Sequence, residues 1–160
     1  MKLVKKGKKG IIWVLIYTKA KEEKKANENL QRQGFKTFLP LIAATNKNSE
    51  SESLVPVFPR YFFAQINLEL DNWTAINSSY GVSHIVMFSE KFTSIPNNII
   101  KLIQCYIVLK DAALLNQFYA YASDIDNDDL DNLPAGAKKY ILQILDKGQN
   151  SAKLSAALQM

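Results

Sequence analysis

An aromatic-rich stretch at residues 57–66 constrains the fold of this chain more than any other feature. Successive side chains of a strand point to opposite faces, so Tyr61 and Phe63 share one face while Phe62 and Ala64 share the other. The stretch therefore predicts a strand that presents aromatic side chains on both of its faces.

The rest of the chain predicts a mixture of strands and helices. A continuous apolar run at residues 11–17 is typical of a central strand buried on both faces. Residues 19–33 are rich in Ala, Glu, Lys and Gln and end at Gly34, which predicts a helix. Further strands are expected at 35–41 and 82–88, and further helices at 71–78, 96–107, 112–121, 134–147 and 151–158. This order predicts an α+β fold, an antiparallel sheet with flanking helices.

The C-terminal part differs in character from the rest. Residues 124–131 are mostly acidic and predict a linker, and Gly148 is expected to separate the two helices of a small hairpin. The chain is therefore expected to comprise a basic flexible arm at 1–10, a folded domain at 11–110, and an acidic linker with a helical tail at 111–160.

Charge is unevenly distributed along the sequence. Residues 1–40 carry 11 Lys or Arg against 3 acidic residues, whereas residues 111–160 carry 4 against 7. A basic front indicates an anionic partner such as nucleic acid. An ordinary set of solvated faces with a basic arm explains the same distribution equally well.

The sequence offers no constellation for catalysis. The single histidine, His84, lies within an apolar strand pattern, and Cys105 lies in the middle of an apolar helix. Neither a metal-ligand spacing nor a phosphate-binding glycine loop is present, so we expect a binding protein without cofactor or metal. One cysteine fits a reducing compartment, and polar residues interrupt the apolar stretch at 99–122, so the chain is expected to be soluble and cytoplasmic.

Four local strings occur in an order typical of a known family. They are WVLIYTK at 13–19, LQRQGF at 30–35, FPRYFF at 58–63, and IN at 76–77 followed by GVSHIVMF at 81–88. Together they resemble the N-terminal domain of the NusG family of transcription elongation factors, and within it the RfaH-like antiterminators. The resemblance implies a factor that binds RNA polymerase and suppresses pausing and termination.

The resemblance also implies contacts with RNA polymerase. The matching positions are Tyr61, Phe63, Asn72, Trp73 and Thr74. Tyr61 and Phe63 match an apolar patch that grips the clamp helices of the β′ subunit, and the other three match a contact with the gate loop of the β subunit. Two alternatives remain open. Tyr61 and Phe63 belong to the core if Phe62 and Ala64 face outward, and Trp73 is explained equally by a role as a core anchor.

RfaH-like proteins also bind the non-template DNA strand. The matching positions are Lys19, Asn29, Arg32, Gln33, Ser79 and Tyr80. Lys25, Asn29, Arg32 and Gln33 independently fall at helical spacing on one polar face. Cations neutralise phosphates, amides bond base edges, and a tyrosine ring stacks on a base. The family often has histidine in place of Asn29 and arginine in place of Tyr80, so we expect either that the recognised sequence differs or that sequence-specific reading is lost.

The C-terminal part departs from the family pattern. Most members carry a KOW β-barrel there, and its glycine pattern is not evident after residue 110. RfaH-like proteins can instead fold this part as helices over the polymerase-binding patch, which implies an intramolecular mask formed by the tail. The alternative function is a nucleic-acid-binding or protein-interaction module on the same scaffold that no longer engages polymerase.

Overall fold

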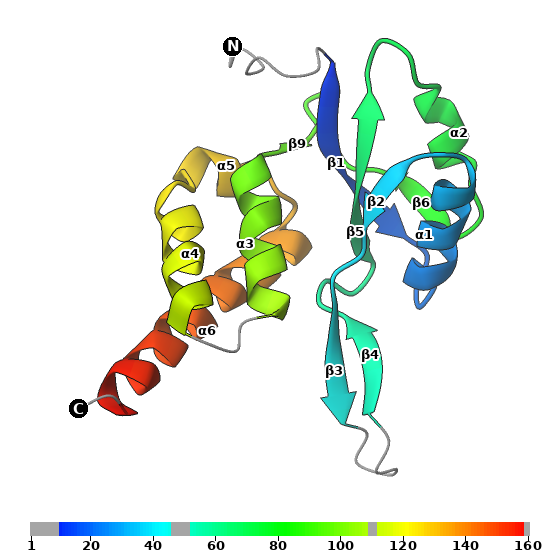
Figure 1. Cartoon of the computed structure of the whole chain (residues 1–160). Helices are drawn as coiled ribbons and strands as arrows, with labels where there is room; N and C mark the ends of the chain where they lie inside the picture. Colours follow the sequence, from blue (N-terminus) through cyan, green and yellow to red (C-terminus); the bar gives the residue numbers. More distant parts are fainter. Residues whose placement is uncertain (1–9, 46–51, 109–111, 159–160) are drawn as a thin grey trace. The chain divides into compact units, whose positions relative to one another are not determined.

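The computed structural model describes residues 10–45, 52–108 and 112–158, which form two compact units. The first unit comprises the described residues of Met1–Leu39 and Phe58–Ile95, and the second those of Pro40–Val57 and Pro96–Met160. The strands are β1 (Ile11–Thr18), β2 (Lys36–Phe38), β3 (Leu41–Thr45), β4 (Glu52–Pro56), β5 (Tyr61–Asn67), β6 (Val82–Ile85), β7 (Met87–Phe88), β8 (Lys91–Phe92) and β9 (Ser94–Ile95) (Figure 1). The helices are α1 (Glu23–Arg32), α2 (Trp73–Asn77), α3 (Asn97–Ile107), α4 (Ala112–Ser123), α5 (Asn127–Asp131) and α6 (Ala135–Leu158).

A five-stranded antiparallel sheet organises the first unit. Its order is β2-β5-β1-β6, and β9 pairs with β1 as well. The aromatic strand β5 lies beside β1, with Phe62 opposite Ile16 and Phe63 opposite Leu15. The predicted α+β fold with an antiparallel sheet and flanking helices is confirmed, and helices follow it at the C-terminus. The basic arm predicted before the sheet lies, up to residue 9, outside the described residues.

One face of this sheet forms the core of the first unit. Helices α1 and α2 cover this face (Figure 1). The fully enclosed members of this core are Val14, Ile16, Ala26, Leu30, Phe62, Ala64 and Ile76. Phe62 and Ala64 therefore point into the core, and the alternative in which these two side chains face outward is wrong. Alternation along β5 places Tyr61 and Phe63 on the opposite face.

Helix α1 ends as the sequence predicts and begins later than predicted. Gly34 has φ +94°, and the N–H of Gly34 donates to Gln31 O at 3.0 Å while that of Phe35 donates to Leu30 O at 3.1 Å. Such a left-handed glycine closes a helix by satisfying its last carbonyls. At the other end Lys21 has φ +62°, which cannot continue a helix, so residues 19–22 form a turn before α1.

The predicted strand at 82–88 is divided in two. Its first part, β6, pairs with β1, whereas β7 turns away and forms a hairpin with β8. Ser89 and Glu90 make the hairpin turn with φ values of +51° and +65°. Because hairpin turns of this kind normally use Asn or Gly, the sequence carries no signal for this one.

The second unit combines a hairpin with a helical assembly. Strands β3 and β4 pair antiparallel, and residues 46–51 between them lie outside the described residues. Helix α3 packs against α4 and α6. The side chains that these helices bury include Ile99, Leu102, Ile103, Phe118, Ile141 and Ile144. Helix α3 begins at Asn97, one residue later than expected from the sequence. Pro96 is its N-cap residue and has an extended backbone.

The C-terminal helices differ from the predicted hairpin in two places. Residues 127–131, expected to be linker, form the short helix α5, whose first turn is held by a reciprocal capping box between Asp126 and Asp129. The predicted break at Gly148 is wrong, since α6 is one helix from Ala135 to Leu158. A glycine inside a helix costs only about 1 kcal/mol, and the helix-forming residues around it offset this cost.

Candidate nucleic-acid and polymerase interfaces

The loop at residues 79–81 is attached to α1 by side-chain hydrogen bonds. The Nδ2 of Asn29 donates to Tyr80 O at 3.1 Å, and the Nε2 of Gln33 donates to Ser79 Oγ at 2.7 Å. Gln33 Nε2 also donates to Asn29 O at 3.3 Å. The bonds to the loop join residues 51 and 46 positions apart in the chain. Four residues that the sequence assigned to DNA binding therefore lie side by side.

Gly81 brings the loop into close contact with the helix. Its φ is +86°, and a Cβ at this position would lie 3.1 Å from both the N and the Cβ of Ala26. The carbonyl of Gly81 accepts a hydrogen bond of 2.9 Å from the N–H of Lys19. Only glycine fits this position without displacing backbone, and Lys19 is thereby joined to the same site.

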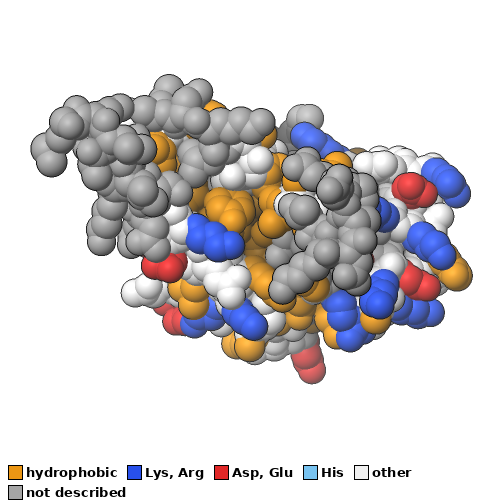
Figure 2. Space-filling model, turned by 90° about the horizontal axis from the view of Figure 1, so that it is seen from below, with side chains coloured by type: hydrophobic (Ala, Val, Ile, Leu, Met, Phe, Trp, Pro, Cys, Tyr) orange, Lys and Arg blue, Asp and Glu red, His pale blue; other side chains and the backbone are white. Residues whose placement is uncertain are grey.

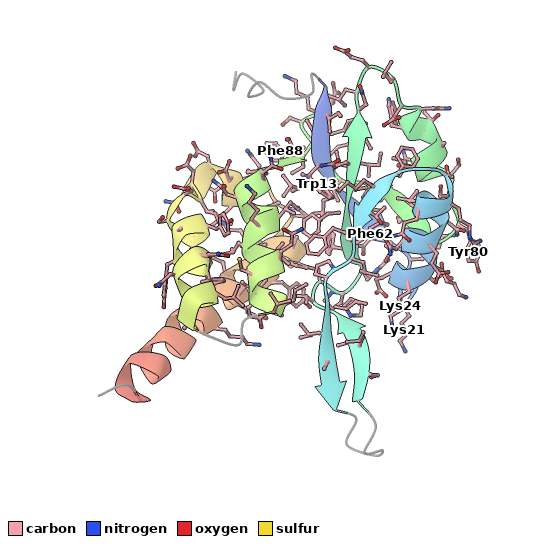
Figure 3. The ribbon with its side chains drawn as sticks, in the orientation of Figure 1. Trp13, Lys21, Lys24, Phe62, Tyr80 and Phe88 are labelled. Carbon is pink, nitrogen blue, oxygen red and sulfur yellow. The ribbon has the colours of Figure 1, made fainter. Side chains whose placement is uncertain are left out.

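The Tyr80 ring is the exposed aromatic group of this site. The residue exposes 62% of its surface, and its ring projects beside α1 (Figure 3). The Nζ of Lys25 lies 5.9 Å from the ring centroid, within the range of a cation–π contact. Lys25 belongs to the polar helix face found in the sequence, although the family resemblance assigned it no role.

Several exposed cations lie on α1 and on the turn before it. The exposed basic side chains of this segment are Lys19, Lys21, Lys24, Lys25 and Arg32. Lys21 and Lys24 lie at the beginning of α1 (Figure 3), and Figure 2 shows Lys and Arg side chains gathered on the side where Figure 1 draws this helix. Arg32 and Glu28 approach to 4.0 Å with side chains 75% and 64% exposed, so this pair is weak and leaves the guanidinium accessible.

A second cluster lies on the opposite face of the sheet, around Tyr61. The Tyr17 and Tyr61 rings lie 5.1 Å apart, and His84 lies 5.2 Å from Tyr17. The guanidinium of Arg60 lies 4.3 Å from the Tyr17 centroid, and its Nε donates to Thr18 O at 3.1 Å. The arrangement presents a half-buried phenol beside a fixed cation. Sequence reasoning identified only Tyr61 of this cluster.

The turn before β5 is held by a buried carboxylate that sequence reasoning missed. Glu23 Oε1 accepts a 3.1 Å hydrogen bond from the N–H of Arg60, whose φ is +72°. The Arg60 carbonyl in turn accepts from the N–H of Thr18 at 2.8 Å. Burial raises the pKa of Tyr61, the adjacent Tyr17 adds to the rise, and Arg60 opposes it.

Phe63 is more enclosed than its predicted role requires. It exposes 2% of its surface. Its ring stacks on Phe38 at 5.9 Å and meets Phe58 edge-on at 5.6 Å. A partner can contact Phe63 only if this ring becomes exposed.

The residues 72–74 form the start of α2. Asn72 caps the helix by accepting from the N–H of Thr74 at 3.2 Å, and the Thr74 hydroxyl donates to the same oxygen. The Trp73 ring lies edge-on to Phe92 at 5.2 Å, and the residue is 38% exposed. The ring is thus partly packed and partly available to a partner.

The described part of the chain contains neither a candidate metal site nor a candidate membrane-spanning helix. No three His, Cys, Asp or Glu side chains there gather in a way that would hold a metal ion. None of the helices in these ranges combines the length and apolar character needed to span a membrane.

Comparison with known proteins gives the family. The first unit is an α+β domain built on an antiparallel sheet. The family model described as "Transcription termination factor nusG" matches residues 12–104, more than half of the chain. This chain belongs to the NusG family of transcription factors.

Several solved structures are similar to part of this chain. One of them is described as "Domain interaction in Thermotoga maritima NusG" and matches with a TM-score of 0.47 and 18% sequence identity. The match covers 64% of this chain and 60% of that chain, so this chain corresponds to less than two thirds of the Thermotoga protein.

Proposed function

We propose that this chain is a specialised elongation factor of the RfaH-like kind, which binds RNA polymerase and the non-template DNA strand and thereby suppresses pausing and termination. It acts by binding and catalyses no reaction. The observation that carries the proposal is the contact between α1 and the loop at 79–81, which gathers the residues matched to DNA binding onto one surface of a NusG-family domain.

The polymerase-binding surface is the sheet face around Tyr61 and Phe63, and its partner is the pair of clamp helices of the β′ subunit. Half-buried aromatic rings with a fixed cation suit a helical partner, because tyrosine, phenylalanine and arginine carry much of the affinity of protein interfaces. The exposed part of Trp73, with Asn72 and Thr74, is the proposed contact with the gate loop of the β subunit.

The resemblance to RfaH-like proteins implies a further element of regulation, an intramolecular mask. Phe63 packs against Phe38 and Phe58 of its own unit, so a partner that contacts this ring must first gain access to it. We assign the role of mask to the C-terminal helices α5 and α6, whose helical structure agrees with the helical tail of RfaH-like proteins. Removal of residues 124–160 should then raise polymerase affinity, and no gain in binding by a folded truncated chain would contradict the mask.

Retention on immobilised core RNA polymerase tests the proposal. The full chain should be retained, and the double variant Tyr61→Ala with Phe63→Ala should lose retention by at least about tenfold, as expected when interface anchors are removed. Phe88→Ala is a control for the loss of an exposed ring of the same unit, from the β7–β8 hairpin. Because Phe63 is buried, a thermal unfolding curve checks that the double variant remains folded. If neither the full chain nor the truncated chain is retained, the protein is a nucleic-acid-binding or protein-interaction module that does not engage polymerase.

A further inference from the structure

We propose that Asn29 and Gln33 are positioning residues, which hold Tyr80 as a stacking platform for one unpaired nucleobase, so that the site binds single-stranded DNA with little discrimination among bases. The inference rests on the proposed DNA binding and goes beyond it by naming how the base is held. It differs from the role expected from the sequence, in which these amides bond base edges.

The hydrogen bonds of Gln33 leave it no donor for a base. An amide group carries two N–H hydrogens, and those of Gln33 point to Ser79 Oγ and Asn29 O. Reading an adenine edge takes one amide N–H together with the amide oxygen. Gln33 therefore cannot make this bidentate contact while it holds the loop. Asn29 uses one of its two Nδ2 hydrogens for the carbonyl of Tyr80.

The same bonds fix the backbone that carries the Tyr80 ring. Gln33 holds the side chain of Ser79, which precedes Tyr80, and Asn29 holds the Tyr80 carbonyl. Gly81, which follows Tyr80, packs closely on Ala26. A ring that is exposed yet attached to a rigid support stacks without a large loss of conformational entropy. Stacking tolerates any base, because every base presents a π-face.

The charges around the ring contact phosphate instead of base edges. Lys25 lies over the ring at 5.9 Å, so the opposite face of Tyr80 is the one that receives the base. Arg32 lies on the same helix, exposed and only weakly paired with Glu28. Cations at such positions neutralise phosphates on either side of a stacked base, and phosphate contacts carry no sequence information.

The test measures binding of the full chain to fluorescent oligonucleotides of about 12 nucleotides by anisotropy, a length within the span of known single-strand sites. Oligo-dT, oligo-dC and a mixed sequence should bind with affinities within about fivefold of one another, and the duplex of the mixed sequence should bind more weakly. Tyr80→Ala should lower every single-strand affinity by about tenfold, whereas Tyr80→Phe should retain most of it.

Double variants separate positioning from base reading. Asn29→Ala should lower all three affinities by the same factor, about three- to tenfold, and should add little when Tyr80→Ala is already present, because both changes disable one platform. Gln31→Ala is the control, since Gln31 is an exposed amide of α1 that bonds Thr37 and does not bond the loop. A thermal unfolding curve of Asn29→Ala checks that the chain remains folded.

Three results would overturn the inference. The first is a base preference above about tenfold in the unmodified chain that is lost in Asn29→Ala or Gln33→Ala. The second is that the losses of affinity caused by Asn29→Ala and Tyr80→Ala add fully in the double variant. The third is the absence of any single-strand binding, which also removes the DNA part of the proposed function. Retention on polymerase is measured separately, so failure to bind polymerase is distinguishable from failure of the platform.

Discussion

The two proposed surfaces of the first unit are built in different ways. The surface around Tyr61 comes from neighbouring strands, and its residues alternate with core residues such as Phe62 along β5. The surface around Tyr80 is assembled by side-chain bonds between α1 and a loop that are 46 to 51 positions apart. The first therefore depends on the sheet, whereas the second depends on a few hydrogen bonds that single substitutions remove.

The largest expected effect is a loss of stability when a core residue of the sheet is removed. Phe62→Ala should destabilise the protein by about 3–5 kcal/mol, because it leaves a cavity in the fully buried core between the sheet and its helices. Chemical denaturation measures the change. Leu70→Ala is the control, since this side chain is 82% exposed and its removal should change stability by less than about 0.5 kcal/mol. Equal losses in the two variants would contradict the assigned core.

The second prediction concerns a substitution that disturbs the surface around Tyr80 alone. Gly81→Ala should destabilise the loop by about 1–3 kcal/mol, because the new Cβ meets Ala26 at 3.1 Å and the backbone is left-handed. Gly34→Ala is a matched control with φ +94° and open space around its Cβ, so it carries the backbone strain alone, about 1–2 kcal/mol. Only Gly81→Ala should also weaken single-strand binding. Weaker binding in both variants would point to a general effect of folding.

The third prediction concerns charge at the same surface. Arg32→Ala should reduce the slope of log affinity against log salt concentration for single-stranded DNA by about 0.7, the value expected when one fewer phosphate is neutralised. The slope is measured from anisotropy titrations at several salt concentrations. Lys91→Ala removes an exposed cation from β8 and should leave the slope unchanged. An unchanged slope in Arg32→Ala would exclude this face of α1 as a phosphate-binding surface.

The smallest effect concerns the surface around Tyr61. Burial and the nearby Tyr17 raise the pKa of Tyr61 above its usual 10.0, so the folded state holds the phenol proton more tightly than the unfolded state. The resulting stabilisation is complete below pH 10 and is lost as the pH rises through the folded pKa. Tyr61→Phe should therefore lose less stability than the unmodified chain as the pH rises above about 10, measured by denaturation. The same decline in both proteins would mean that this phenol does not contribute.

The sequence predicted well those features that depend on local pattern. Alternation along β5 separated Phe62 and Ala64 from Tyr61 and Phe63, the apolar run at 11–17 gave the central strand, and Gly34 marked the end of α1. The residues of the surface around Tyr80 came from polar spacing on a helix and from the family resemblance. Their contact with one another could not be predicted, because the bonds of Asn29 and Gln33 depend on the tertiary fold.

Other features were missed for identifiable physical reasons. The β7–β8 hairpin turns at Ser89 and Glu90, which take positive φ without the usual Gly or Asn. Glu23 looked like an ordinary solvated helix residue, and only its bond to the N–H of Arg60 reveals its role. Gly148 looked like a helix stop, yet α6 continues through it.

The most direct test of the two proposed surfaces is binding of the full chain to a transcription elongation complex assembled with and without an exposed non-template strand. We expect retention that requires Tyr61 and Phe63 in both complexes, and an additional gain with the exposed strand that Tyr80→Ala removes. Retention that is insensitive to Tyr61 and Phe63, or a gain with the exposed strand that Tyr80→Ala leaves intact, would contradict the proposal.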